Sequence, residues 1–336
     1  MNIREQNEEL ERQILSKYAS LSVNTKGRRE DEEKCPLRTD YQRDRDRILH
    51  SKAFRRLKHK TQVFISPNGD HYRTRLTHTL EVAQISRTIA RALRLNEDLV
   101  EAIALGHDLG HTPFGHIGED ALDKITKTGF KHNIQSLRVV DELEVTDKRR
   151  GLNLTYEVRD GIKNHSGPGK SITLETELVR ICDRIAYINH DIDDSIRAGI
   201  IVRDEIPSEI SQVLGFSHGE RINSMVGDII ENSYNKDKIQ MSDEVKETSQ
   251  ALRKFMFERV YLDNEVKAEA DKAEYVIISL YKYYCENPDC LPDRYMVSGT
   301  ETDLEQNICD YIAGMTDRYV MYKYKEIFVP KSWTII

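Results

Sequence analysis

The strongest constraint on this chain is the spacing of its apolar residues, which recur every three to four positions over several long stretches. That period matches the turn of about 3.6 residues in an α-helix that buries one face. Residues 77–95, 96–110 and 173–200 follow it, and residues 244–262 repeat the pattern near the C-terminus. In the first stretch the apolar positions are Leu80, Ala83, Ile85, Ile89, Ala90 and Leu93. The sequence therefore predicts a mostly α-helical protein.

Strand signals are few. The stretch "KTQVFISPNGDHYRT" at 60–74 contains the dipeptide Asn68-Gly69, which is typical of a two-residue hairpin turn. We therefore expect at most one short β-hairpin in an otherwise helical fold.

The chain divides into three expected regions. Its 336 residues slightly exceed the size at which a single apolar core stops growing. The stretch "NTKGRREDEE" is polar and charged and predicts a mobile connection after an N-terminal helix. We expect the helix and connection at 1–34, the main body at 35–200, and a C-terminal helical region packed on it at 201–336.

Charge and composition argue against several classes of protein. The net charge of −7 argues against a surface built to grip duplex nucleic acid. No apolar run approaches the roughly 18–20 residues that span a bilayer, and the N-terminus lacks a signal-peptide core. The five cysteines include no Cys-x-x-Cys pair, so we expect reduced thiols. These features predict a cytoplasmic protein without a membrane association.

Histidines concentrate in the stretch "GHDLGHTPFGH" at 106–116. His107 lies four residues after Ile103 and seven after Val100, so it projects from the apolar face of its helix. A buried histidine beside the carboxylate of Asp108 is costly unless both are satisfied, and a divalent cation would satisfy them. For an isolated pair, a core histidine bonded to the aspartate is the simpler interpretation.

Two further residues make the metal interpretation stronger. His78 opens the preceding apolar helix, and Asp183 lies on the inner face of the third, four residues after Val179. With His107 and Asp108, they form a set of two imidazoles and two carboxylates. Such a set suits Mn²⁺, Fe²⁺, Ni²⁺, Mg²⁺ or Zn²⁺, and the sequence does not choose among these ions.

Cations that could bind a polyanionic substrate lie beside these ligands. Arg75 precedes His78 by three residues, and Arg184 follows Asp183 directly. Residues 43–60 carry eight Lys or Arg against two Asp. The alternating "RDRDR" part of that run is equally well explained as a solvated, salt-bridged helix face. For the two arginines we expect contacts to phosphate.

His116 and Glu119 form a second candidate pair. Beyond the break at Pro113 and Gly115, they stand three residues apart and would share a face of a new helix. Cleavage of a phosphate ester expels an alkoxide that needs a proton, and His116 supported by Glu119 could supply it. A capping or surface role is the alternative. Neither His132 nor His165 would be judged catalytic on its own, and His165 is expected as a polar contact in a loop.

The order of these residues resembles the HD-domain metal-dependent phosphohydrolases, which are named for the histidine-aspartate doublet. More specific stretches resemble the deoxyguanosinetriphosphate triphosphohydrolase family, over about residue 5 to the C-terminus. They read "RTDYQRDRDRILHSKAFRRLKHKTQVF", "HYRTRLTHTLEVAQISRTIARAL", "ALGHDLGHTPFGHIGE", "FKHNIQSLRVV", "LVRICDRIAYINHDIDD" and "AGMTDRY". The resemblance implies a multi-helix HD-domain fold, with the catalytic core at 35–200.

The resemblance also implies a reaction and roles for named residues. Family members cleave a dNTP between the 5′ oxygen and the α-phosphorus, releasing a deoxynucleoside and intact triphosphate. The resemblance implies that the metal ligands are His78, His107, Asp108 and Asp183. It also implies that Arg75 and Arg184 contact the phosphates. It further implies a catalytic His116 assisted by Glu119, with His132 close to the α-phosphate.

A sugar pocket is implied by Gln62, Tyr187 and Asp191, in which the tyrosine ring would exclude a 2′-hydroxyl. Asp183, Tyr187 and Asp191 follow one another at four-residue steps, which independently places them on one helix face. His111 either lines the phosphate side of the pocket or fixes the turn.

The chain lacks the large insertions of the longest family members, so its preferred dNTP stays open. The resemblance implies a homo-oligomer, a tetramer or hexamer, and in some members a second nucleotide that activates the enzyme. Two alternatives also stay open. One is an HD phosphohydrolase for another nucleotide phosphoester. The other is a nucleotide-sensing regulator that binds single-stranded nucleic acid through the basic segment 43–60.

Overall fold

The computed structural model describes residues 1–62, 73–147, 149–296 and 300–331. These residues form fifteen α-helices and one two-stranded hairpin, so the prediction of a mostly α-helical protein is confirmed. No described helix combines the length and the apolar character needed to cross a membrane.

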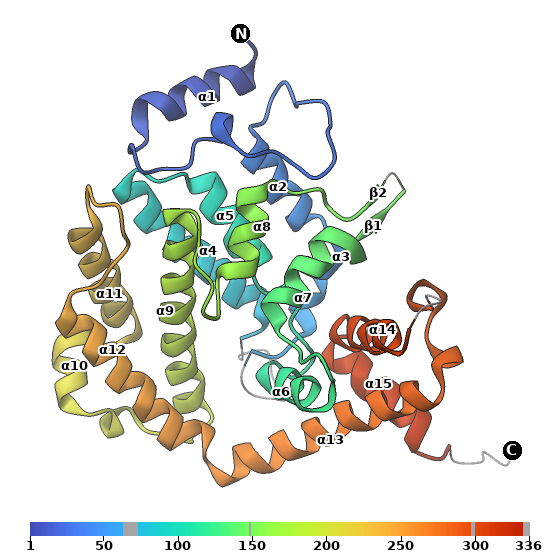
Figure 1. Cartoon of the computed structure of the whole chain (residues 1–336). Helices are drawn as coiled ribbons and strands as arrows, with labels where there is room; N and C mark the ends of the chain where they lie inside the picture. The colour runs from blue at the N-terminus through green and yellow to red at the C-terminus, as the bar shows by residue number, and fades with distance from the viewer. Residues whose placement is uncertain (63–72, 148, 297–299, 332–336) are drawn as a thin grey trace, which may run out of the picture.

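Nine helices and the hairpin lie in the first 200 residues (Figure 1). They are α1 (Ile3–Ile14), α2 (Asp40–Leu49), α3 (Lys52–Arg56), α4 (Arg75–Leu93), α5 (Glu97–Gly106), α6 (His116–Ile125), α7 (His132–Arg138), β1 (Val145–Thr146), β2 (Arg149–Arg150), α8 (Tyr156–Asn164) and α9 (Leu174–Arg197). The later helices are α10 (Ser208–Leu214), α11 (His218–Ser233), α12 (Asp243–Met256), α13 (Asn264–Glu286), α14 (Glu301–Ala313) and α15 (Asp317–Phe328).

The three long apolar stretches of the sequence are α4, α5 and α9, as predicted. The Asn96 side chain accepts a hydrogen bond from the backbone N–H of Leu99 and so caps α5. α4 begins at Arg75, which therefore lies one turn before His78 on the buried side. One residue of the predicted apolar face was placed wrongly, because Leu80 is 47% exposed. The other apolar residues of that helix face, from Ala83 to Leu93, are buried and fill this part of the core.

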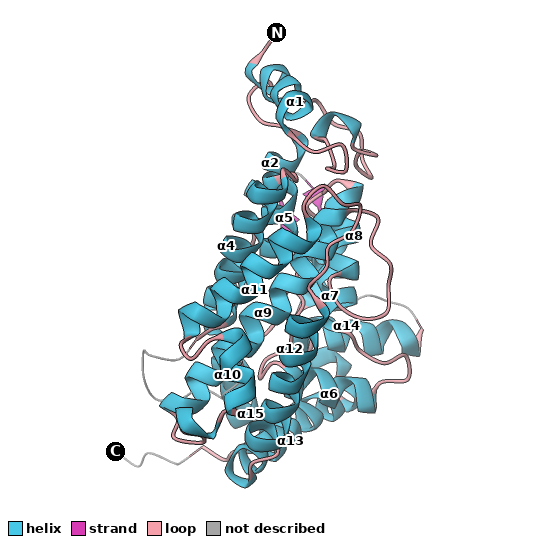
Figure 2. Ribbon diagram, turned by 90° about the vertical axis from the view of Figure 1, so that its left-hand side faces the viewer, coloured by secondary structure: helices cyan, strands magenta, loops and turns pink. Residues whose placement is uncertain are grey.

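Apolar side chains form two separate cores. The larger joins α2, α4, α5, α8 and α9 to α10–α12. The smaller joins α6 to α13–α15. Figure 1 shows α13 crossing from the foot of α12 to α14 and α15, and the turned view of Figure 2 shows α9, α11 and α12 alongside one another. α6 is thus packed on helices more than a hundred residues later in the chain.

Two local predictions need correction or restriction. The connection predicted to be mobile is held to the body, since Arg28, whose side chain is 6% exposed, pairs with Asp40 and Asp44 of α2 and with Glu32. The hairpin predicted around Asn68-Gly69 lies outside the described residues. Its flanks, Thr61 and Thr74, form an antiparallel bridge. The hairpin that is described, β1–β2, was not predicted from the sequence.

Candidate active site

Three helices of the larger core bring the four predicted metal ligands together. α4 supplies His78, the end of α5 supplies His107 and Asp108, and α9 supplies Asp183. His78 Nε2 lies 3.0 Å from Asp183 Oδ1 and 4.0 Å from Asp108 Oδ2. His107 Nε2 lies 3.4 Å from Asp108 Oδ1 and 3.7 Å from Asp183 Oδ1. Side chains predicted from separate stretches therefore meet at one point.

The donor atoms at this point fit a divalent cation. The Nδ1 atom of His107 lies 2.6 Å from the Ala104 carbonyl oxygen, so that nitrogen carries the proton. The buried Nε2 atom of His107 then faces both carboxylates without a hydrogen-bond partner. Although burial disfavours its charged form, Asp108 and Asp183 raise the pKa of His107 to about 9. The carboxylates thus create a strongly negative position that favours a cation.

The pKa values of the Asp108 and Asp183 carboxyl groups also favour a bound cation. Burial opposes ionisation of Asp108, but His107 and Arg75 together hold its pKa well below the usual value. Burial likewise opposes ionisation of Asp183, and His78 and His107 outweigh it. Both groups therefore stay ionised near neutral pH, the form in which carboxylates bind metals.

Arg75 is a buried cation with free donors. It is 1% exposed, and its Nη1 donates to Asp108 Oδ2 at 2.7 Å. Its Nε and Nη2 atoms have no protein partner, although both are buried. Gly115 has a φ of +60°, and a Cβ there would come within 2.9 Å of Arg75 Nη2. The missing side chain leaves room for the guanidinium, whose unpaired N–H groups can bind an anion.

Arg184 occupies a more open position on α9. Burial lowers its pKa, and Arg180 and Arg253 add to the effect. Two further guanidinium groups, from α9 and α12, are thus close enough to act on Arg184. The sequence indicated Arg184 alone, because Arg253 lies on a helix whose position relative to α9 is a tertiary feature.

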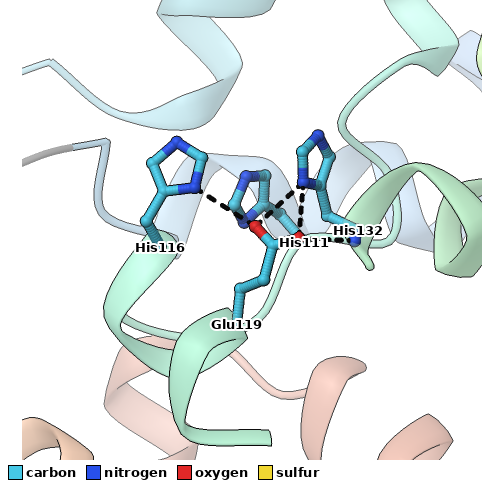
Figure 3. A group of neighbouring side chains, drawn as sticks. All are labelled: His111, His116, Glu119 and His132. Atoms are coloured by element: carbon cyan, nitrogen blue, oxygen red, sulfur yellow. Dashed lines mark hydrogen bonds and ion pairs between the residues drawn. The ribbon is translucent and has the colours of Figure 1, made fainter. Parts of the chain in front are cut away.

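The pair of His116 and Glu119 lies at the start of α6, as predicted (Figure 3). His116 Nδ1 lies 3.1 Å from Glu119 Oε2. His132 Nδ1 lies 2.9 Å from both Glu119 oxygens, and the His132 backbone N–H donates to Oε1. Glu119 is 6% exposed, whereas the side chain of His116 is 55% exposed. One buried carboxylate therefore orients two imidazoles, and the more open ring belongs to His116.

His111 lies behind this pair. Its ring stacks on His132 with centroids 4.3 Å apart and meets His116 edge-on at 5.0 Å. Burial holds the pKa of His111 well below the usual value, with further lowering from Arg75 and His132. A neutral His111 therefore supports the other two rings, and its backbone carbonyl accepts a bond from the buried Lys60. Both roles considered from the sequence, lining the pocket and fixing the turn, agree with this position.

Among the residues predicted for the sugar pocket, Tyr187 lies beside His116. The ring of Tyr187 meets His116 edge-on, with centroids 6.3 Å apart. Tyr261 donates its hydroxyl to Asp191 Oδ2 and lies 6.3 Å from the Tyr187 ring. Gln62 Oε1 and Asp191 Oδ1 are buried without a protein partner, so both can accept a bond from a ligand hydroxyl. Burial raises the pKa of Asp191 to about 8.

Three residues of this neighbourhood were missed from the sequence. Tyr261 follows α12, and only the packing of α12 on α9 brings it to Asp191. His165 was expected as a loop contact, yet it is buried with its ring centroid 4.9 Å from that of His107. Asp317 accepts from the backbone N–H groups of Thr61 and Phe114, and so ties the segment before Gln62 to the segment before His116. The "AGMTDRY" stretch contained Asp317 without indicating this role.

Comparison with protein families agrees with the geometry. Residues 75–188 match the HD domain, and residues 239–326 match the phosphohydrolase-associated domain. A deoxyguanosinetriphosphate triphosphohydrolase-like protein of Caldanaerobacter subterraneus is 58% identical over 99% of this chain and 98% of its own length. The chain belongs to this family. A member from Desulfatibacillum aliphaticivorans is 49% identical over 98% of this chain and 99% of its own length.

Two solved structures share the fold of this chain. A phosphohydrolase from Bacteroides thetaiotaomicron superposes with a TM-score of 0.53 at 17% identity, over 84% of this chain and 67% of its own. A protein from Aquifex aeolicus superposes with a TM-score of 0.51 at 20% identity, over 86% and 68%. The family and the fold together make this chain a hydrolase of the HD phosphohydrolase type, with a His/Asp cluster that could hold a divalent ion.

Proposed function

We propose that this chain is a metal-dependent dNTP triphosphohydrolase. It would hydrolyse dGTP, and other dNTPs as further candidates, to the deoxynucleoside and inorganic triphosphate by attack of water at the α-phosphorus. The observation that carries the proposal is the convergence of a His/Asp cluster, a buried arginine with free N–H groups and an oriented, accessible histidine. The names of the most similar relatives support the choice of substrate.

The metal ligands in this proposal are His78, His107, Asp108 and Asp183. A divalent ion held there would polarise the phosphoryl group and lower the pKa of a bound water. The four side chains contribute by presenting their donor atoms from three rigid helices.

The cations orient the triphosphate. Arg75 is fixed by its bond to Asp108, so its remaining N–H groups have a defined direction before substrate arrives. Arg184 lies at the exposed edge, where the outer phosphates would lie. His132 is placed between Glu119 and the His/Asp cluster, a position suited to a contact with the α-phosphate.

The leaving 5′ oxygen needs a proton, and we assign its delivery to His116. Glu119 accepts from His116 Nδ1, which leaves the Nε2 atom to carry the transferred proton. Burial opposes ionisation of Glu119, but His116 and His132 hold its pKa well below the usual value, so it stays a carboxylate. Such a carboxylate stabilises the imidazolium and fixes the ring plane.

Selection for deoxyribose would come from Gln62, Tyr187 and Asp191. The free oxygens of Gln62 and Asp191 suit a 3′-hydroxyl. The Tyr187 ring, held next to Tyr261, would close against the 2′ carbon. A ribonucleotide would bring its 2′-hydroxyl against this ring.

The proposal is tested by incubating the purified protein with each of the four dNTPs, with Mn²⁺, with Mg²⁺ and without metal, and separating the products. Deoxynucleoside and triphosphate in equal amounts, only with metal, are expected. Phosphate with dNDP, or pyrophosphate with dNMP, would contradict the reaction. Hydrolysis of another nucleotide phosphoester alone, or binding of single-stranded nucleic acid without any hydrolysis, would favour one of the two alternatives.

Two further expectations belong to the same proposal. We expect a homo-oligomer, a tetramer or hexamer, which light scattering after gel filtration measures directly. Addition of a second, unhydrolysed nucleotide to the product assay measures whether an effector site activates hydrolysis. A monomer at assay concentration would contradict the first expectation.

A further inference from the structure

The turn between α5 and α6 has an unfavourable backbone conformation directly before His116. Phe114 has a φ of +61° and Gly115 a φ of +60°. A bulky residue such as phenylalanine rarely adopts the left-handed region, and it stays there only where the surrounding structure fixes it. On one side, the Phe114 ring is 3% exposed and packed in the smaller core. The direction in which α6 begins, and with it the position of His116, depends on how this turn is held.

A buried carboxylate holds the backbone of the turn. Asp317 is the first residue of α15 and is 3% exposed. Its Oδ1 accepts a hydrogen bond from the backbone N–H of Phe114 at 3.0 Å. Its Oδ2 accepts from the backbone N–H of Thr61 at 2.8 Å and from the Thr61 hydroxyl. The N-terminal end of a helix favours a negative group, so α15 presents one carboxylate to two distant segments.

The two segments joined by this carboxylate also touch each other. A Cβ at Gly115 would lie 3.2 Å from the carbonyl oxygen of Gln62. Lys60, which is 2% exposed, donates its Nζ to the carbonyl oxygen of His111 and, at 2.7 Å, to that of Ala313. The segment before Gln62, the turn before α6 and the start of α15 are therefore bound together by buried hydrogen bonds.

We propose that Asp317 is a positioning residue of the active site, which sets the direction of His116 through Phe114 and the place of Gln62 through Thr61. In this role Asp317 contacts neither the substrate nor the metal. One carboxylate of the C-terminal region would couple the proton donor to the sugar contact. The inference rests on the proposed function, because it takes His116 as the acid and Gln62 as an acceptor for the 3′-hydroxyl.

Asp317→Asn is the first test, because an amide has one acceptor oxygen where the carboxylate has two. If that oxygen keeps the two bonds from Thr61, the NH₂ group faces the N–H of Phe114, and the turn loses its hydrogen bond. A misplacement of about 1 Å at a reacting group can cost about 100-fold in rate, so we expect kcat to fall by about 10- to 100-fold. Mn²⁺ affinity should stay unchanged, since the proposed ligands lie on α4, α9 and the end of α5.

A double-mutant cycle separates positioning from mere stabilisation. In His116→Ala/Asp317→Asn the loss in kcat should be about tenfold smaller than the product of the two single losses, because the turn then has no acid to direct. Glu157→Gln is the matched control. Glu157 is 5% exposed and accepts from the Thr25 hydroxyl and the Lys26 backbone N–H. This control should lower Tm and leave kcat unchanged. Single losses that simply multiply would overturn the inference, since Asp317 would then only stabilise the fold.

Thr61→Val tests the other side of the carboxylate and keeps the inference falsifiable if Asp317→Asn fails to fold. Valine preserves the shape of the side chain and removes its hydroxyl donor. The preference for a dNTP over its 2′,3′-dideoxy form, measured as a ratio of kcat/KM values, should fall by about three- to tenfold as the bond from the 3′-hydroxyl to Gln62 weakens. An unchanged preference in folded Thr61→Val would overturn the coupling to Gln62.

The outcomes also separate this inference from the proposed function. A wild-type protein that releases no triphosphate from any dNTP would contradict the reaction. Amide hydrogen exchange, read by mass spectrometry, then still tests the tie, because the peptide that contains Phe114 should exchange faster in Asp317→Asn and at the wild-type rate in Glu157→Gln. Unchanged exchange in Asp317→Asn would overturn the inference. An active wild type with an equally active Asp317→Asn would overturn it as well and leave the reaction standing.

Discussion

Replacing His116 by alanine is the sharpest test of the proposed proton donor. The side chain is 55% exposed, and Glu119 holds its Nδ1 at 3.1 Å. A positioned general acid contributes about 10²–10⁴-fold to a rate. Because water can reach this position and replace part of the function, we expect a loss near the middle of the range, about 10³-fold. That corresponds to about 4 kcal/mol in the activation free energy.

The assay compares two substrates. In a dNTP whose 5′ oxygen is replaced by sulfur, the leaving group is a thiolate, which needs no proton because a thiol has a pKa of about 8.5. His116→Ala should therefore lose about 10³-fold in kcat on the oxygen substrate and within about tenfold on the sulfur substrate. His59→Ala, which removes an exposed histidine outside the site, should lose nothing on either. Equal losses of the His116 variant on both substrates would refute its role as the acid.

Three other predictions concern binding and stability. Asp183→Asn should keep its helical circular dichroism but bind Mn²⁺ about 100-fold or more weakly in calorimetry. The reason is that the loss of a residue that only supports a metal ligand already lowers metal affinity by about 10–100-fold. Unchanged affinity would exclude Asp183 as a ligand. Burial raises the pKa of Asp191 to about 8, so between about pH 4 and pH 8 the folded state keeps a proton that the unfolded chain has released, and stability falls as the pH rises through this window and levels off above about pH 8. Asp191→Asn should flatten that fall in Tm, and a parallel fall would contradict the prediction. In Gly110→Ala the new Cβ would lie 2.2 Å from the backbone of α7, which should lower the free energy of unfolding by about 1–3 kcal/mol. The control, Gly219→Ala, places its Cβ in open space and should not destabilise the protein. Equal Tm values for the two variants would refute the argument.

The helices and the inward direction of the proposed ligands could be predicted because both depend on local order. Once an apolar face is fixed by its neighbours, a histidine or aspartate in register with it, such as His107 or Asp183, must face inward. The Asn96 cap and the start of α6 at His116 follow from residue type and a glycine break in the same way. For these residues the sequence indicates which way the side chain points as well as what it is.

The misses all depend on contacts between distant segments. His165 ends α8, and nothing near it in the sequence indicates that the end of α8 faces α5 and α7. Tyr261 reaches Asp191 across 70 residues, and Asp317 reaches Thr61 across 256. The connection around Arg28 looked mobile because its charges suggested solvent, whereas its ion pairs with α2 bury it. Such pairings are decided by the packing of whole helices.

The division of the apolar side chains between two cores has a consequence for how this enzyme can vary. The proposed ligands stand on the larger core, whereas His116 and Glu119 stand on α6, which packs with α13–α15. Asp317 holds the start of α6 from the C-terminal side, and Asp310 holds α7 through Arg138 at 2.8 Å. In the proposed mechanism, sequence drift in the C-terminal helices would therefore change the speed of proton delivery while leaving the proposed metal ligands in place. Turnover and metal affinity would then be separately heritable traits of one chain.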